Sequence, residues 1–176
     1  RLLRDPDHAR FRPQPPRTRY DELSVARTAA PRIETTATRV RERLLAAWQA
    51  HDWERVSSLL PPGFRSRDQQ WHVDSDRDAY LESFRPMFDA FASTPTVEVL
   101  ATRGDRLVLS RASWTFSGRD AGESQLEWLS LLEVDDRGDV SIIIDFDPAA
   151  LDAAYAELDA HYAAGEGAAH ENVAAA

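Results

Sequence analysis

Hydrophobic residues in the first half of the chain recur at the spacing of one helix face. Thr35 or Thr36 can cap a first helix, Asp52 can cap a short second helix, and the Pro-Pro-Gly run at 61–63 ends that second helix. The apolar positions of the three stretches are, in order, Val40, Leu44, Leu45 and Trp48; Val56, Leu59 and Leu60; and Tyr80, Phe84, Met87 and Phe88. We therefore expect three amphipathic helices before residue 96.

The spacing changes to a period of two from residue 96 onward. Two weak strands at 64–67 and 71–73 come first, and four longer strands are expected at 96–102, 106–116, 125–134 and 140–146. Short turns join neighbouring long strands, and links of that length make the strands antiparallel. A last helix follows over about 149–162, and Gly165 ends it. The order predicts an α+β fold, in which a curved antiparallel sheet packs against the N-terminal helices and a C-terminal helix follows.

The two ends of the chain lack this patterning. Residues 1–34 are rich in arginine and are punctuated by proline, so they predict a linker or tail. Residues 166–176 predict a disordered tail, which leaves one domain over 35–165. The chain begins at Arg1 and not at a methionine, so we expect upstream domains of a longer protein.

Charge and composition remove several classes of function. The net charge is −9, which would repel a phosphate backbone, so nucleic acid is not an expected partner. No apolar run is long enough to span a bilayer, so no membrane partner is expected either. Cysteine is absent, which excludes disulfides and thiolate metal sites and fits a cytoplasmic location. No pattern in the sequence indicates a cofactor.

A strand hairpin supplies the first candidate site. The turn Asp136-Arg137-Gly138 predicts that Val134 lies opposite Val140, Leu132 opposite Ile142 and Trp128 opposite Phe146. That register places Glu127 and Asp145 on one sheet face, where a compatible neighbouring strand adds Arg111. Buried, an arginine flanked by carboxylates could orient a water or polarise a carbonyl oxygen. Exposed, the same three residues are a surface cluster or a dimer contact, which is the interpretation we favour.

Histidine supplies the second candidate. His72 and Asp74 are two residues apart in a weak strand, so they could share a face as a general base and its orienting carboxylate. The same segment adjoins a helix start, which favours an ordinary surface position. No pair of histidines has metal-ligand spacing on an expected helix or strand, so no metal site is expected.

Aromatic side chains supply the third candidate. Six of them can line an apolar pocket between helices and sheet: Trp48, Tyr80, Phe84, Phe88, Trp114 and Trp128. Aromatic residues at helical spacing are equally typical of a solid core, so both interpretations stay open. Tyr80 could offer its hydroxyl to a bound molecule.

The order of elements resembles the SnoaL-like branch of the nuclear transport factor 2-like superfamily. The stretches that carry the likeness are 46–53, 76–81, 101–107, 127–129 and 146–148, and it covers about 35–165. The resemblance implies a cone-shaped sheet with a pocket under the helices, and usually a homodimer. It is closest to the domain that ends actinobacterial multidomain regulatory proteins. Members include isomerases, dehydratases, hydrolases, cyclases and non-enzymatic domains, so the fold does not settle the function.

The resemblance also disfavours one reaction. Limonene epoxide hydrolases use an arginine and an aspartate two apart on one strand, with a further aspartate near the end of the last strand. Arg111 corresponds to the arginine, whereas Ser113 and Ile144 stand where the two carboxylates would be. We therefore favour a non-catalytic accessory domain that binds a small hydrophobic ligand or forms a dimer. The alternative is a small hydrolase, dehydratase or cyclase that acts on a hydrophobic substrate in the cone.

Overall fold

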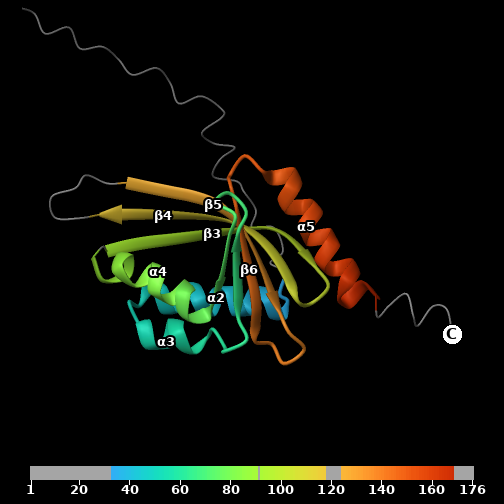
Figure 1. The fold of residues 1–176 in the computed structure, drawn as a ribbon, viewed down its shortest axis with the longest axis horizontal. Helices are drawn as coiled ribbons and strands as arrows, with labels where there is room; N and C mark the ends of the chain where they lie inside the picture. Colours follow the sequence, from blue (N-terminus) through green and yellow to red (C-terminus); the bar gives the residue numbers. More distant parts are fainter. Residues whose placement is uncertain (1–32, 91, 118–123, 169–176) are drawn as a thin grey trace, which may run out of the picture. The chain divides into compact units, whose positions relative to one another are not determined.

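The computed structural model describes residues 33–90, 92–117 and 124–168 (Figure 1). The predicted linker at 1–34 lies almost entirely outside these residues, and so does the tail beyond residue 168. Residues 166–168, which we assigned to the tail, belong to the fold. The Glu166 carboxylate accepts hydrogen bonds from the backbone amides of Asp105 and Arg106 at 3.0 to 3.1 Å. No helix of the described part is long and apolar enough to cross a membrane.

Within the described residues, three helices precede the four long strands, as the apolar spacing predicted. They are α2 (Thr36–Gln49), α3 (Trp53–Ser58) and α4 (Arg77–Ala90). Thr35 caps α2 because its hydroxyl accepts the Thr38 amide while the Thr38 hydroxyl accepts the Thr35 amide. Asp52 caps α3 by accepting the Arg55 amide at 2.9 Å. The capped starts fix where each apolar stripe begins and thus which side chains face the sheet.

In the part of the chain that the structure describes, six strands form one sheet whose order is β2-β1-β6-β5-β4-β3. All neighbours pair antiparallel except β1 and β6, which pair parallel. Their bounds are β1 (Arg65–Asp68), β2 (Val73–Asp76), β3 (Ala92–Arg103), β4 (Leu107–Ser117), β5 (Ser124–Val134) and β6 (Val140–Phe146). The predicted α+β class with an antiparallel meander is confirmed.

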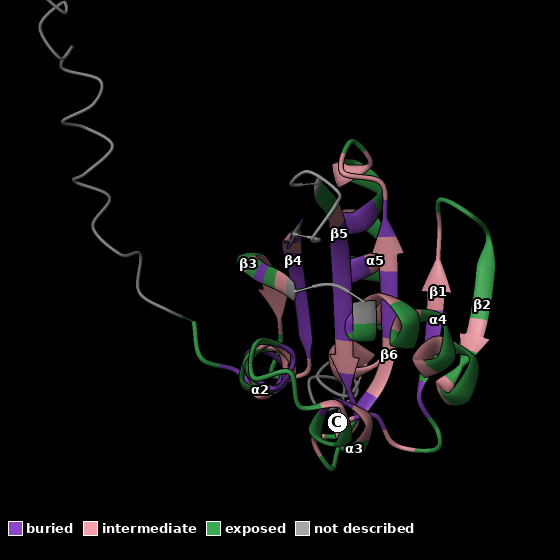
Figure 2. Cartoon of the chain, turned by 90° about the vertical axis from the view of Figure 1, so that its left-hand side faces the viewer, coloured by how far each residue is buried: buried purple, intermediate pink, exposed green. Residues whose placement is uncertain are grey.

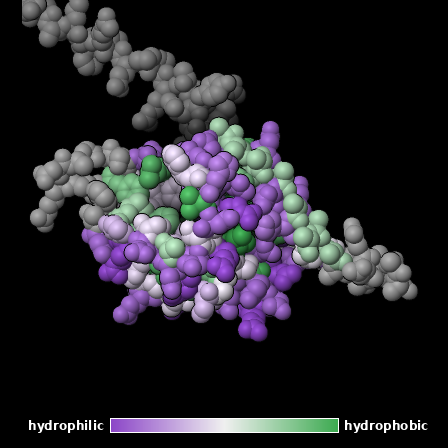
Figure 3. Space-filling view, in the orientation of Figure 1, coloured by the Kyte–Doolittle hydropathy of each residue, from purple (hydrophilic) through white to green (hydrophobic). Residues whose placement is uncertain are grey.

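Helices cover both faces of this sheet, so each central strand is buried on two sides (Figure 2). Helices α2 to α4 cover one face, where the core includes Val40, Leu60, Val108, Leu132 and Ile143. Helix α5 (Leu151–Ala164) covers the other, where Leu109, Leu129, Leu131, Ile144 and Phe146 pack on Ala154 and Leu158. The outer side of α5 is rich in alanine, which gives the pale band along that helix in Figure 3.

A β-bulge at Ser141 changes the register of the last hairpin. Val134 pairs with Val140, as predicted, but Glu133 then pairs with Ile142, and Ser141 is the extra residue. Its hydroxyl donates to the Glu133 carbonyl at 3.1 Å. The predicted pairs Leu132 with Ile142 and Trp128 with Phe146 are therefore wrong, and every residue of β6 after the bulge faces the side opposite to our prediction.

The packing of α5 gives a first prediction. Leu158 is fully buried against the sheet, so Leu158→Ala should lower the free energy of unfolding by about 2–5 kcal/mol through lost burial and a cavity. Urea denaturation followed by circular dichroism measures this loss. Ala156→Ser on the exposed side of the same helix is the matched control and should change stability little. Equal effects of the two substitutions would contradict the packing described.

Candidate functional site

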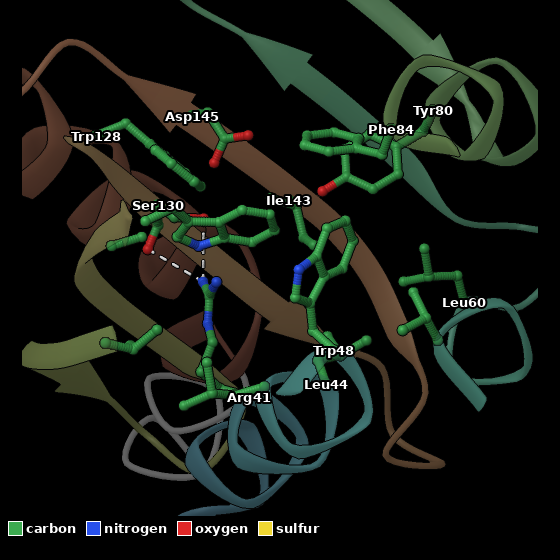
Figure 4. A pocket seen from close by; sticks show the side chains of 15 residues that line it. Arg41, Leu44, Trp48, Leu60, Tyr80, Phe84, Trp128, Ser130, Ile143 and Asp145 are labelled. Atoms are coloured by element: carbon green, nitrogen blue, oxygen red, sulfur yellow. Dashed lines mark hydrogen bonds between the residues drawn. The ribbon is translucent and has the colours of Figure 1, made fainter. Parts of the chain in front are cut away.

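A cavity of about 90 Å³ lies between the sheet and the helices α2 to α4. Most of its wall is apolar, and its polar groups come from Arg41, Tyr80, Ser130 and Asp145 (Figure 4). The full lining consists of Arg41, Leu44, Leu45, Trp48, Val56, Leu60, Tyr80, Phe84, Val97, Ala112, Trp114, Trp128, Ser130, Ile143 and Asp145. An apolar pocket with a few convergent polar groups is the arrangement expected of a small-molecule site.

Helical and strand spacing bring these residues together. Arg41, Leu44 and Trp48 lie three and four residues apart on α2, and Tyr80 and Phe84 are four apart on α4, so each set shares one helix face. On the sheet side the lining alternates along each strand. Ala112 and Trp114 come from β4, Trp128 and Ser130 from β5, and Ile143 and Asp145 from β6.

Five of the six aromatic residues singled out in the sequence line the cavity, and Phe88 does not. Phe88 is buried behind Trp48, with its ring edge-on at 5.0 Å between centroids. The Trp48 indole nitrogen donates to the Ser93 hydroxyl at 2.7 Å, which fixes the ring at the cavity wall. The aromatic residues therefore form both a packed layer and the wall of a pocket, because the rings contact one another and leave a small cavity beside them.

Arg41 provides a positive charge in the cavity that the sequence analysis did not single out. Its Nη2 atom donates to the carbonyl and hydroxyl oxygens of Ser130 at 3.2 and 3.1 Å (Figure 4). Its Nε atom is buried and has no hydrogen-bond partner. Burial lowers the pKa of Arg41, and the nearby Asp145 charge counteracts that effect. An arginine on the apolar stripe of a helix was the signal in the sequence that could have revealed it.

Asp145 provides the negative charge. Its Oδ1 atom is buried and has no hydrogen-bond partner among the described residues. Burial raises the pKa of this carboxyl from an ordinary value of 3.8 to about 6, while the Ser130 side chain, the Arg41 charge and the Trp128 indole oppose the rise. No ion pair within 4.0 Å joins Asp145 to Arg41 in the described structure. The carboxylate is thus balanced by a nearby charge but not saturated by direct contacts.

Tyr80 completes the polar end of the cavity. Burial and the Asp145 charge raise its pKa well above the ordinary value, so the phenol stays protonated. Its hydroxyl points into the cavity (Figure 4), and no hydrogen bond from it to another described residue occurs. One acceptor on Asp145 and donors on Tyr80 and Arg41 therefore surround a single small space. Such a set can move a proton and stabilise an oxygen that gains negative charge.

The predicted Arg111–Glu127–Asp145 cluster does not form. Arg111 and Glu127 do pair, at 3.2 Å between Nη1 and Oε1, but their side chains are 40% and 37% exposed, on the sheet face away from the cavity. Asp145 faces the cavity instead, because the bulge at Ser141 shifts β6 by one residue. The Arg111–Glu127 pair therefore lies outside the cavity, with both side chains partly exposed.

The predicted pair of His72 and Asp74 lies on the exposed β1–β2 hairpin, outside the cavity. His72 sits in the turn with φ +53°, and Asp74 bonds Arg67 at 2.9 Å, so no bond from Asp74 orients the imidazole. Among the described residues there is also no group of three histidine or acidic side chains that could hold a metal ion.

A comparison with known families identifies this arrangement of helices, sheet and cavity. Residues 41–141 match the SnoaL-like domain, which is more than half of the chain. The chain belongs to the SnoaL-like domain family. The match spans from Arg41 on α2 to the bulge residue Ser141 on β6. A comparison with curated proteins finds no match.

Solved structures of several kinds share the fold of this SnoaL-like domain. A Δ5-3-ketosteroid isomerase from a Mycobacterium species has a TM-score of 0.55 at 9% identity, over 63% of this chain and 92% of that one. An LEH-like epoxide hydrolase from Mycobacterium tuberculosis has a TM-score of 0.53 at 17% identity, over 65% of this chain and 79% of that one. A Mycobacterium tuberculosis protein in complex with estradiol-17β-hemisuccinate has a TM-score of 0.55 at 13% identity, over 64% of this chain and 93% of that one. Structures at identities this low share the nuclear transport factor 2-like fold with this chain, and the likeness carries no information about its chemistry.

Burial of Asp145 gives a prediction for stability against pH. Between pH 3.8 and about pH 6, the Asp145 carboxyl is protonated in the folded protein and ionised in the unfolded chain. The contribution of this group to the free energy of unfolding is therefore complete below about pH 4 and is lost as the pH rises through about 6. In Asp145→Asn this contribution is absent. The difference in unfolding free energy, wild type minus variant, should fall by up to about 3 kcal/mol from pH 4 to pH 7. Urea titrations at each pH measure it, and a constant difference would contradict the burial.

A third prediction concerns the charge of Arg41. Because this charge lowers the pKa of Asp145, replacing it in Arg41→Met should raise that pKa above about 6. Carbon-detected NMR of the aspartate carboxyl groups against pH measures the change. Arg43→Met, an exposed position on the same helix, is the matched control and should leave the pKa of Asp145 where it is. An unchanged value in Arg41→Met would show that the two charges do not interact.

Proposed function

We propose that this SnoaL-like domain is an acid–base enzyme, in which Asp145 exchanges a proton with a small hydrophobic substrate held in the cavity. The observation that carries the proposal is the Asp145 carboxylate, whose Oδ1 atom is buried and lacks a partner at the wall of an apolar hollow. A buried polar atom without a partner costs free energy, so a group kept in that condition is a candidate for function.

The protonation states suit proton abstraction next to a carbonyl group. With its pKa raised to about 6, Asp145 is mostly ionised at neutral pH and is a stronger base than an exposed aspartate. Tyr80 stays protonated and can donate a hydrogen bond to the oxygen that becomes negative when the proton leaves. The Arg41 charge adds favourable electrostatics to the same oxygen. Each of the three polar groups thus has a distinct part in one step.

Epoxide hydrolysis remains disfavoured for a corrected reason. Arg111 and Ser113 lie on the sheet face away from the cavity, and Ile144 packs under α5. Asp145, not Ile144, is the β6 residue that faces the cavity. Asp145 is also the only carboxylate in the described lining, so the arrangement of one arginine between two carboxylates is not present there.

Binding without conversion is the second candidate, and it corresponds to an accessory domain of a larger regulatory protein. The Arg41 charge favours it, since this charge opposes the rise in the pKa of Asp145 and so weakens the carboxylate as a base. Under this alternative the polar end only orients a ligand. A homodimer of such domains could then connect the ligand to regulation.

The test uses a simple ketone in deuterated buffer. We expect the protein to accelerate exchange of the α-hydrogens of cyclohexanone, measured by proton NMR, and Asp145→Asn to lose about 10²- to 10⁴-fold of that acceleration. The rate in the wild type should rise with pH through about 6, as the carboxyl becomes ionised.

Asp74→Asn is the matched control, because Asp74 is an exposed aspartate outside the cavity. This variant should catalyse exchange of the cyclohexanone α-hydrogens at the same rate as the wild type. Cyclohexanone that binds in the cavity without any exchange would favour the second candidate. Equal loss in both variants would contradict the role assigned to Asp145.

A further inference from the structure

The space beside Asp145 is limited by aromatic rings that touch one another. Trp114 is central, with ring centroids 4.3 Å from Trp48, 5.3 Å from Trp128 and 6.3 Å from Phe84. Tyr80 continues the layer at 4.7 Å from Phe84. The hollow that these rings leave is about 90 Å³, whereas pockets for drug-sized ligands measure about 300–1,000 Å³. A molecule of several fused rings is therefore too large for the cavity as it stands.

The charges at the polar end add a second restriction. Arginine side chains keep their positive charge at neutral pH, and Asp145, whose pKa is raised to about 6, is mostly negative there. Together Arg41 and Asp145 therefore bring almost no net charge to the cavity. A charged ligand would enter an apolar hollow without a counter-charge of its own, and an unpaired buried charge is strongly unfavourable. An uncharged ligand leaves the existing balance intact.

The polar groups are also confined to one part of the wall. The Tyr80 hydroxyl can donate, the Asp145 carboxylate can accept, and Ser130 is already bonded to Arg41. The remaining lining is hydrocarbon and aromatic apart from the indole nitrogens, of which that of Trp48 is bonded to Ser93. A ligand with polar groups at both ends would leave one of them unpaired.

We infer that the ligand is an uncharged molecule of single-ring size that carries one oxygen function, and that Trp114 sets this limit. The inference rests on the proposed function for the identity of the site. Trp114 is the residue to vary because it comes from β4 and contacts rings of α2, α4 and β5, whereas Trp48 also holds α2 to β3 through Ser93.

The experiment measures binding and not turnover, so that it can fail separately from the proposed function. Three neutral ketones of increasing size serve as probes: cyclohexanone, 1-decalone and a four-ring 3-ketosteroid. Cyclohexanecarboxylate tests the effect of charge. Saturation-transfer NMR and calorimetry at pH 7.5 give the affinities for wild type, Trp114→Ala and Trp71→Ala. Trp71 is 70% exposed on the β1–β2 hairpin and is the matched tryptophan outside the cavity.

In the wild type we expect cyclohexanone to bind more tightly than 1-decalone, and the steroid and the carboxylate not to bind measurably. Trp114→Ala should tighten binding of 1-decalone by about tenfold, because the vacated space accepts the second ring. Trp71→Ala should bind all probes as the wild type does.

A wild type that binds the steroid or the carboxylate at least as tightly as cyclohexanone would overturn the inference, and so would a failure to bind any ketone. These wild-type results decide the question even if Trp114→Ala does not fold. Binding in the expected order by a protein without exchange activity would contradict only the proposed function.

Discussion

The bulge at Ser141 is the constraint on which the site depends. One unpaired residue between Val140 and Ile142 turns the rest of β6 over, so that Asp145 enters the cavity and Ile144 and Phe146 pack under α5. Without it, a carboxylate would lie beneath an alanine-rich helix and two large apolar side chains would fill the hollow. The bulge thus satisfies two requirements together. It gives α5 a continuous apolar surface, and it gives the opposite face a buried carboxylate.

A buried carboxylate of this kind is unfavourable for folding, and its surroundings show how the cost is limited. Burial is the largest influence on Asp145, and its effect is opposed by the Ser130 side chain, the Arg41 charge and the Trp128 indole. Arg41 in turn is held by two hydrogen bonds to Ser130. The charges of Arg41 and Asp145 compensate each other although their side chains are farther apart than the 4.0 Å of an ion pair. A direct contact would stabilise the fold more but would occupy the acceptor that the proposed reaction needs.

Much of this fold was predictable from periodicity alone, whereas the site was only partly so. The apolar stripes located the helices, and the alternation located the strands, because both depend on local spacing. The bulge could not be found that way, since a turn-based register propagates along a hairpin until a single extra residue breaks it. Periodicity also could not show that α5 covers the second face of the sheet. Leu129 and Leu131 on that face are compatible with either a dimer interface or a helix that packs on them. Arg41 was visible as a charge on an apolar stripe, but its partner Ser130 is 89 residues away in sequence.

The cavity persists on one sheet face and not on the other because of what lines it. Under α5 the fully buried side chains of the sheet are hydrocarbon, so Ala154 and Leu158 can pack against them without leaving a polar group unpaired. Under α2 and α4, four polar groups stand at the edge of the hollow, and two of them, Arg41 and Asp145, have buried atoms without partners. An apolar side chain placed there would leave these atoms permanently unpaired, and that cost works against filling the hollow. The unpaired atoms of Arg41 and Asp145 are therefore the groups with which the proposed ligand would form hydrogen bonds.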